Sequence, residues 1–132
     1  DLAFFLGGMP KKITSYRAGG LNWHPRGSIY SGAGISENNA LFSYHANWAS
    51  AGRWGVEVMT PKHKLIFRPL EKLQIQKLGS MATEETPIEN KRDVEFKPGL
   101  YRLIRSFLTD KKNLPTIDEQ IKNWKYCQLI EK

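Results

Sequence analysis

The stretch that decides the fold is LFSYHANWASAGRWGVEVMTPKHKLIFRPLEKLQIQ, residues 41–76. Apolar and polar residues alternate within it in four short runs, at 41–48, 53–60, 64–68 and 71–76. Alternation with a period of two is typical of strands that bury one face. Because short turns separate the runs, the stretch predicts an antiparallel meander of four strands, apolar on one side.

The two faces of this predicted sheet differ in chemistry. The apolar face collects Phe42, Tyr44, Ala46, Trp48, Trp54, Val56, Val58, Leu65, Phe67, Leu73 and Ile75. The polar face holds His45, Arg53, Glu57, Arg68 and Gln74. An extended sheet is a good self-complementary surface for a two-fold dimer. We therefore expect the polar face to pack against a second copy of the chain, which makes a homo-oligomer.

Two further strands are predicted before this stretch, at 11–18 and 28–36, the second weakened by its glycines. Between them, residues 19–27 form a loop rich in Gly and Pro. Residues 79–93 are polar and aperiodic, which predicts a long surface loop.

Helices are expected at both ends of the chain. Residues 1–6 read as the end of a helix, because two glycines and a proline follow them. A second helix is predicted to begin at Pro98, with Leu100, Leu103, Ile104 and Phe107 on one face.

The last predicted helix begins with a capping-box pattern at Thr116 and Glu119. Its apolar stripe is Ile117, Ile121, Trp124, Cys127 and Ile130. Strands in the middle and helices at the ends predict an α+β fold, mainly antiparallel sheet with helices packed on one face. We expect a single domain over residues 1–132.

The chain carries a net charge of +7, from 20 basic and 13 acidic residues. This charge fits an anionic partner, but the even spread of basic residues favours an ordinary solvated surface. The single cysteine excludes an internal disulfide, which fits a reducing compartment. The opening apolar run lacks the basic leader and small-residue cleavage site of a signal peptide, and no apolar run approaches roughly 20 residues. We therefore expect a cytoplasmic protein without a membrane partner, and a removed targeting segment stays open.

No catalytic or metal-binding motif is recognisable. In SGAGIS (31–36) the glycine pattern of a nucleotide loop is incomplete, because Glu37 stands where the third glycine belongs. The three histidines, His24, His45 and His63, lack the spacing of metal ligands. Cys127 is expected to be a small buried hydrophobe rather than a nucleophile. The sequence thus predicts no catalytic residue and no metal site.

The loop around Trp23, His24 and Arg26 combines an aromatic face with hydrogen-bond donors and a cation. Such groups stack on a sugar ring and orient its hydroxyls or a carboxylate. A structural loop, with Trp23 packed down and Arg26 in water, accounts equally well for these residues. Nucleic-acid binding is disfavoured, because the other aromatic residues alternate as core positions in strands.

DLAFFLGGMPKKITSYRAGG (1–20) resembles the start of the C-terminal domain in the glucose–fructose oxidoreductase/inositol dehydrogenase (Gfo/Idh/MocA) family. There, a helix carrying His-x-x-Asp continues into an apolar run, a Leu-x-Gly stop, a Pro and the first strand. Asp1 matches the Asp of that motif, and the catalytic His would lie three residues upstream, outside this chain. Residues 41–76 resemble the meander of the family's bacterial sugar-metabolism branch, and residues 96–108 and 114–132 resemble its closing helices.

This resemblance implies a two-domain oxidoreductase that depends on NAD or NADP. An N-terminal Rossmann domain would bind the dinucleotide, and the C-terminal sheet domain would shape the sugar site. The present chain has no dinucleotide fingerprint, and Glu71-Lys72-Leu73 is not the family's Glu-Lys-Pro motif. We therefore expect a fragment that binds no dinucleotide alone, with the missing Rossmann domain as its partner. Calorimetry showing tight dinucleotide binding would contradict this.

The resulting hypothesis is the substrate-side and oligomerisation domain of an enzyme that oxidises a sugar, cyclitol or nucleotide-sugar. The residues expected near substrate are Trp23, His24, Arg26, Lys97 and Tyr101. The alternative is a free-standing basic binding module for an anionic glycan or nucleic acid. Binding that falls steeply with salt would favour the alternative.

Overall fold

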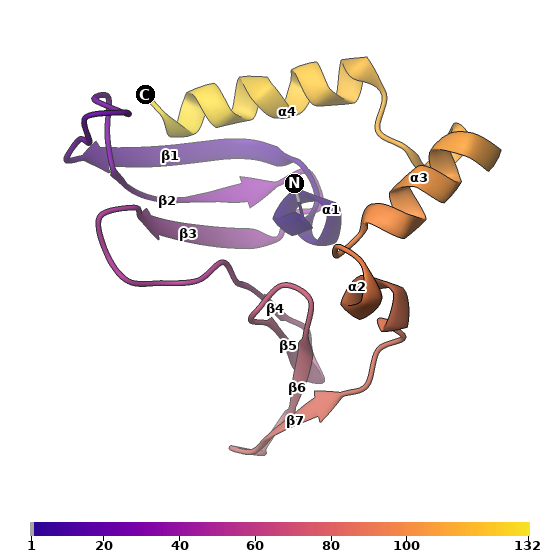
Figure 1. Ribbon diagram of the computed structural model, residues 1–132. Coiled ribbons are helices and arrows are strands. Elements are labelled where there is room, and N and C mark those ends of the chain that lie inside the picture. Colours follow the sequence, from indigo (N-terminus) through magenta and orange to yellow (C-terminus); the bar gives the residue numbers. More distant parts are fainter. Residues whose placement is uncertain (1) are drawn as a thin grey trace. The chain divides into compact units, whose positions relative to one another are not determined.

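The computed structural model describes residues 2–132, so Asp1 and its match to the family motif lie outside the described residues. The α+β class is confirmed (Figure 1). The chain divides into two compact units. One runs up to Arg53 and resumes with Asp118–Lys132, and the other is Trp54–Ile117.

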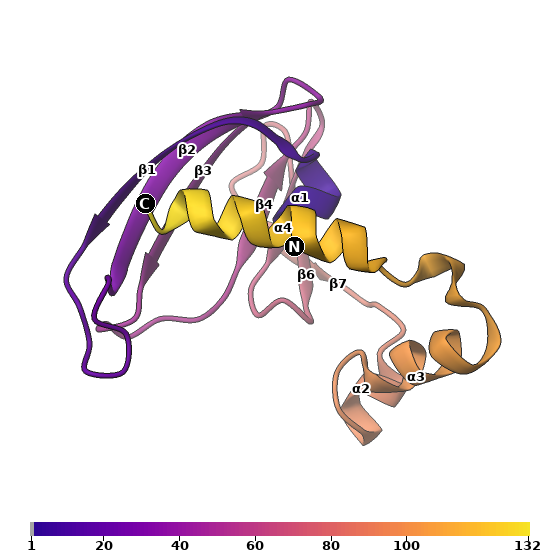
Figure 2. The same cartoon turned by 90° about the horizontal axis from the view of Figure 1, so that it is seen from above.

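The first unit is a three-stranded antiparallel sheet with two helices. It contains α1 (Leu2–Gly7), β1 (Pro10–Ala18), β2 (Ile29–Ser36), β3 (Leu41–Asn47) and, from its second residue on, α4 (Ile117–Ile130). The strands lie in the order β1-β2-β3. Figure 2 shows α1 and α4 on the concave side of this sheet, where the rings of Phe4 and Tyr126 lie 5.9 Å apart.

The glycines of β2 make room for the aromatic side chains of β3. Gly34 pairs with Phe42, and Gly32 pairs with Tyr44. A Cβ on Gly34 would lie 2.5 Å from the Phe42 ring, and one on Gly32 would overlap the Tyr44 hydroxyl. Tyr44 also shares a 2.5 Å hydrogen bond with the Ser15 hydroxyl of β1. Because Gly32 and Gly34 have no side chain, the rings of Tyr44 and Phe42 can lie directly against β2 on the concave face.

The second unit is a four-stranded antiparallel sheet followed by short helices. It contains β4 (Val56–Met59), β5 (His63–Phe67), β6 (Leu73–Lys77), β7 (Thr83–Thr86), α2 (Lys91–Glu95), α3 (Leu100–Thr109) and the 3₁₀ turn η1 (Lys111–Asn113). The strand order is β4-β5-β6-β7. One face carries half-buried apolar residues, with Val58, Leu65 and Ile75 side by side, as predicted from the alternation.

The prediction that residues 41–76 form one meander is wrong, because this stretch is divided between two sheets. Within the described residues, β3 pairs with β2, whereas β4 pairs with β5. The Asn47 side chain accepts a hydrogen bond from the backbone N–H of Ala49 (3.0 Å), a turn that ends β3. Trp48 and Trp54 therefore lie outside the strands.

Residues 79–93, predicted to be a loop, contain the strand β7 and the start of α2. Thr83–Thr86 pairs with β6, and this pairing satisfies backbone N–H and C=O groups on the edge of β6 that β5 does not reach. Exposed ion pairs join the two strands, Lys72 to Glu85 (3.2 Å) and Lys77 to Glu84 (3.5 Å).

The predicted helices form, with two corrections. The helix α3 begins at Leu100 instead of Pro98, because Gly99 adopts a left-handed conformation (φ 76°) and donates to the Asp93 carboxylate. The stripe of α4 is exposed at Ile121 and Trp124, and Cys127 is also exposed rather than buried. The predicted stripe is exposed because another face of α4, the one that carries Tyr126, is turned toward Phe4.

Burial is uneven along the chain. Among the described residues, Tyr30 is the single buried hydrophobic side chain, 3% exposed.

None of the helices in this part of the chain is both long and apolar enough to cross a membrane.

Candidate functional site: an aromatic cluster beside a cationic hollow

The loop that joins β1 to β2 is closed by its own backbone hydrogen bonds. Leu21 and His24 bond to each other through both main-chain groups, at 2.9 and 3.0 Å. The Ser28 N–H donates to the Ala18 carbonyl at 3.0 Å. This places Trp23 at the tip of a tight turn, where its side chain is 70% exposed.

Four aromatic rings gather at this end of the first sheet. The aromatic cluster consists of Trp23, His24, Tyr30 and Trp48. The indoles of Trp23 and Trp48 stack with centroids 5.5 Å apart and planes 15° apart. The His24 ring meets Trp48 edge-on at 5.0 Å. Since Trp23 is exposed, the stack presents an open indole face to a ligand.

Tyr30 is the buried member of the aromatic cluster. Its ring lies 5.5 Å from that of Trp48, and its hydroxyl donates to the Gly27 carbonyl at 3.3 Å. The Nδ1 atom of His24 lies 2.8 Å from the same carbonyl. A carbonyl oxygen only accepts, so Nδ1 carries the proton and Nε2 of the neutral ring is left as an acceptor.

Basic side chains lie next to the cluster. A hollow of about 470 Å³, which we call the cationic hollow, is lined by Arg17, Arg26, Gln128, Glu131 and Lys132. The Arg17 guanidinium donates to the main-chain carbonyl of Glu131. Arg26, whose side chain is 74% exposed, faces the Glu131 carboxylate at 3.9 Å.

The cationic hollow and the aromatic cluster meet at Gly27. A Cβ on Gly27 would lie 2.6 Å from the Arg17 Cγ and 2.9 Å from the Tyr30 hydroxyl. Arg17 and Tyr30 are also paired across β1 and β2, so their side chains share a face. The alkyl part of Arg17 therefore packs beside Tyr30, and its charged end reaches the hollow.

No family model, curated protein or solved structure matches this chain. The aromatic cluster offers a stacking surface and hydrogen-bonding groups, and the hollow offers cations. Within residues 2–132, no group of three or more His, Cys, Asp or Glu side chains is placed to hold a metal ion. This arrangement is suited to holding a ligand.

The residues expected near substrate divide between the two units. Trp23 and His24 belong to the aromatic cluster, and Arg26 to the cationic hollow. Lys97 and Tyr101 belong to the second unit, where the Arg92 guanidinium lies 4.7 Å from the Tyr101 ring. The expectations missed Tyr30 and Trp48.

The residues expected on one polar interface also divide. Glu57 and Gln74 both pair with Ile66, so they share one face of the second sheet, and Arg68 faces Glu57 at 3.9 Å. His45 is exposed on β3 of the first sheet, and Arg53 lies between the sheets in sequence. The five residues therefore do not share a single sheet face, because the strands belong to two sheets.

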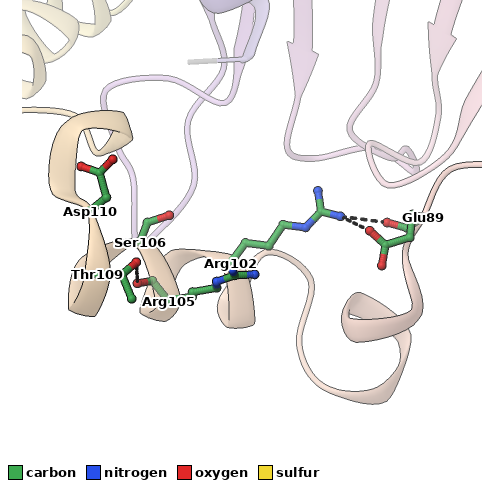
Figure 3. Close-up of a pocket in the computed structure, with 6 residues that line it drawn as sticks. All are labelled: Glu89, Arg102, Arg105, Ser106, Thr109 and Asp110. Atoms are coloured by element: carbon green, nitrogen blue, oxygen red, sulfur yellow. Dashed lines mark hydrogen bonds and ion pairs between the residues drawn. The ribbon is translucent and has the colours of Figure 1, made fainter.

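A second hollow, of about 390 Å³, lies along α3 and is lined by Glu89, Arg102, Arg105, Ser106, Thr109 and Asp110. Figure 3 shows Arg102 extended toward Glu89, with hydrogen bonds of 2.8 Å to its carboxylate and 3.1 Å to its carbonyl. The Thr109 hydroxyl donates back to the Arg105 carbonyl. Because its lining contains no aromatic ring, this hollow lacks the stacking surface of the first site.

Proposed function

We propose that this chain forms one wall of the substrate site in an oxidoreductase that acts on a sugar, cyclitol or nucleotide-sugar. Its part is to hold the ring of the substrate. The observation that carries the proposal is the exposed stack of Trp23 on Trp48, with His24 at its edge. The C–H face of a sugar packs on an indole, and ring hydroxyls bond to the neighbouring polar groups.

Support for the oxidoreductase setting comes from the order of elements. A short helix, a proline at the start of β1, antiparallel strands and a closing helix follow one another as in the resemblance to the Gfo/Idh/MocA family. In this proposal NAD or NADP is bound by a separate Rossmann domain and supplies the hydride chemistry. A homo-oligomer would form through the polar face of the second sheet, around Glu57 and Gln74.

The proposal predicts that the chain binds neutral sugars through Trp23. Titration with glucose or myo-inositol should change tryptophan fluorescence, and calorimetry should give the same dissociation constant. In Trp23→Ala, the constant should rise at least about tenfold, because the stacking surface is lost.

The matched control is Trp54→Ala, which removes another exposed indole (72%) outside the aromatic cluster. It should bind sugar as the unaltered chain does. The proposal fails if no neutral or acidic sugar binds, or if Trp23→Ala binds as tightly as the unaltered chain.

A basic binding module is the second candidate, favoured by the three cationic side chains around the hollow. It requires affinity for a polyanion such as heparin at low salt, with log Kd rising linearly with log salt. Polyanion binding that is indifferent to Trp23→Ala, together with no affinity for single sugars, would select this candidate over the first.

A further inference from the structure

We infer that the cationic hollow is a subsite for an oxyanion on the sugar, so the preferred ligands are sugars bearing a carboxylate or phosphate. The inference rests on the proposed function and narrows its substrate class. The ring would stack on the aromatic cluster, and the oxyanion would enter the hollow beside it.

The geometry joins the two halves of this site. Trp23 and Arg26 belong to one closed loop, three residues apart. Arg17 runs from its packing position beside Tyr30 into the hollow. A ring stacked on Trp23 can therefore direct a charged substituent toward both guanidinium groups.

The charges favour an anion. Three basic side chains, those of Arg17, Arg26 and Lys132, line the hollow together with one acidic side chain, that of Glu131. The 3.9 Å pair between Arg26 and Glu131 joins exposed side chains, and such pairs contribute little stability. A ligand oxyanion can therefore replace Glu131 on Arg26 and take the paired N–H donors that guanidinium offers to carboxylate and phosphate.

Arg17 is already positioned for this role. Its stem is packed, and its hydrogen bond uses the main-chain carbonyl of Glu131, not the carboxylate. Guanidinium carries five donors, so this bond leaves others for a ligand.

The test compares sugars matched in ring structure but not in charge, using the full chain at low salt. Glucuronate and glucose 6-phosphate should each be compared with glucose, by calorimetry and tryptophan fluorescence. At least one anionic sugar should bind about two- to fivefold more tightly than glucose, the gain expected for one exposed ion pair. The two arms show whether the group is a carboxylate or a phosphate.

Variants then separate the hollow from the aromatic cluster. Arg26→Gln should reduce the anionic preference, the ratio of the Kd for glucose to that for the anionic sugar, because it removes one of the two guanidinium groups. Glu131→Gln should enlarge this preference by removing the internal competitor. Arg105→Gln is the matched control, because it removes an arginine from the second hollow. It should change neither affinity.

The outcomes distinguish the two proposals. If glucose and both anionic sugars bind equally, or if Arg26→Gln keeps the full preference of the unaltered chain, the oxyanion subsite is wrong and the sugar-binding proposal stands. If none of the three sugars binds, both are wrong. If inorganic phosphate alone binds as tightly as glucose 6-phosphate without changing tryptophan fluorescence, the hollow takes an adventitious ion only and the inference is overturned.

Discussion

Replacing Tyr30 with alanine is expected to lower the free energy of unfolding by about 3–5 kcal/mol. Tyr30 is 3% exposed and supports Trp48 and His24 through ring contacts. Its removal leaves a cavity under the aromatic cluster, and the Gly27 carbonyl loses a donor. Total stabilities of domains are about 5–15 kcal/mol, so this single change should remove a large share. Urea unfolding followed by circular dichroism measures it.

Two variants give this prediction its controls. Tyr30→Phe keeps the ring and should lose only about 1 kcal/mol, the net value of a hydrogen bond. Tyr16→Ala removes a tyrosine that is 71% exposed on β1 and should cost less than about 0.5 kcal/mol. A loss of under about 1 kcal/mol for Tyr30→Ala would show that Tyr30 is not the centre of the first unit's core.

Gly34→Val is expected to destabilise the chain by about 1–3 kcal/mol, the cost of overpacking. A glycine inside a strand is usually a weak point, and a β-branched residue usually improves it. At Gly34 valine is expected to destabilise the strand instead, because the added Cβ would overlap the Phe42 ring and the main-chain carbonyl of Lys12. Thermal and urea unfolding measure the change.

Ala33→Val is the matched control on the same strand. Ala33 is exposed, and its neighbours Thr14 and Ser43 are also exposed, so valine has room there. We expect this variant to change stability by less than about 0.5 kcal/mol. If both valine variants changed the free energy of unfolding equally, the close packing of the β3 rings against the glycines of β2 would be contradicted.

The class of the fold and most strands were predictable because alternation is local. In β3, Phe42, Tyr44 and Ala46 are half-buried, whereas Leu41 and Ser43 are exposed. The partners of the strands were not predictable, because alternation marks a face and carries no information on the neighbour. The Thr83–Thr86 strand lacks alternation altogether, and its pairing with β6 defines it.

The site was predictable only in part. Trp23 and His24 could be selected by residue type in a Gly- and Pro-rich loop. Trp48 reaches the cluster through the turn after β3, where its N–H donates to the Ser28 carbonyl. Tyr30 was hidden in a stretch whose glycines suggested a weak strand, and their packing role depends on the register with β3. Contacts of this kind depend on strand pairing, which the sequence pattern leaves open.

Binding of the sugar ring by the aromatic cluster is tested most directly by the indole N–H signals of the protein. The chain has four tryptophans, which give four resolvable ¹H–¹⁵N signals assignable by single Trp→Phe variants. On titration with the best-bound sugar, the signals of Trp23 and Trp48 should shift together, while those of Trp54 and Trp124 stay in place. Shifts confined to Trp54 or Trp124, or four unmoved signals at saturating sugar, would contradict the account.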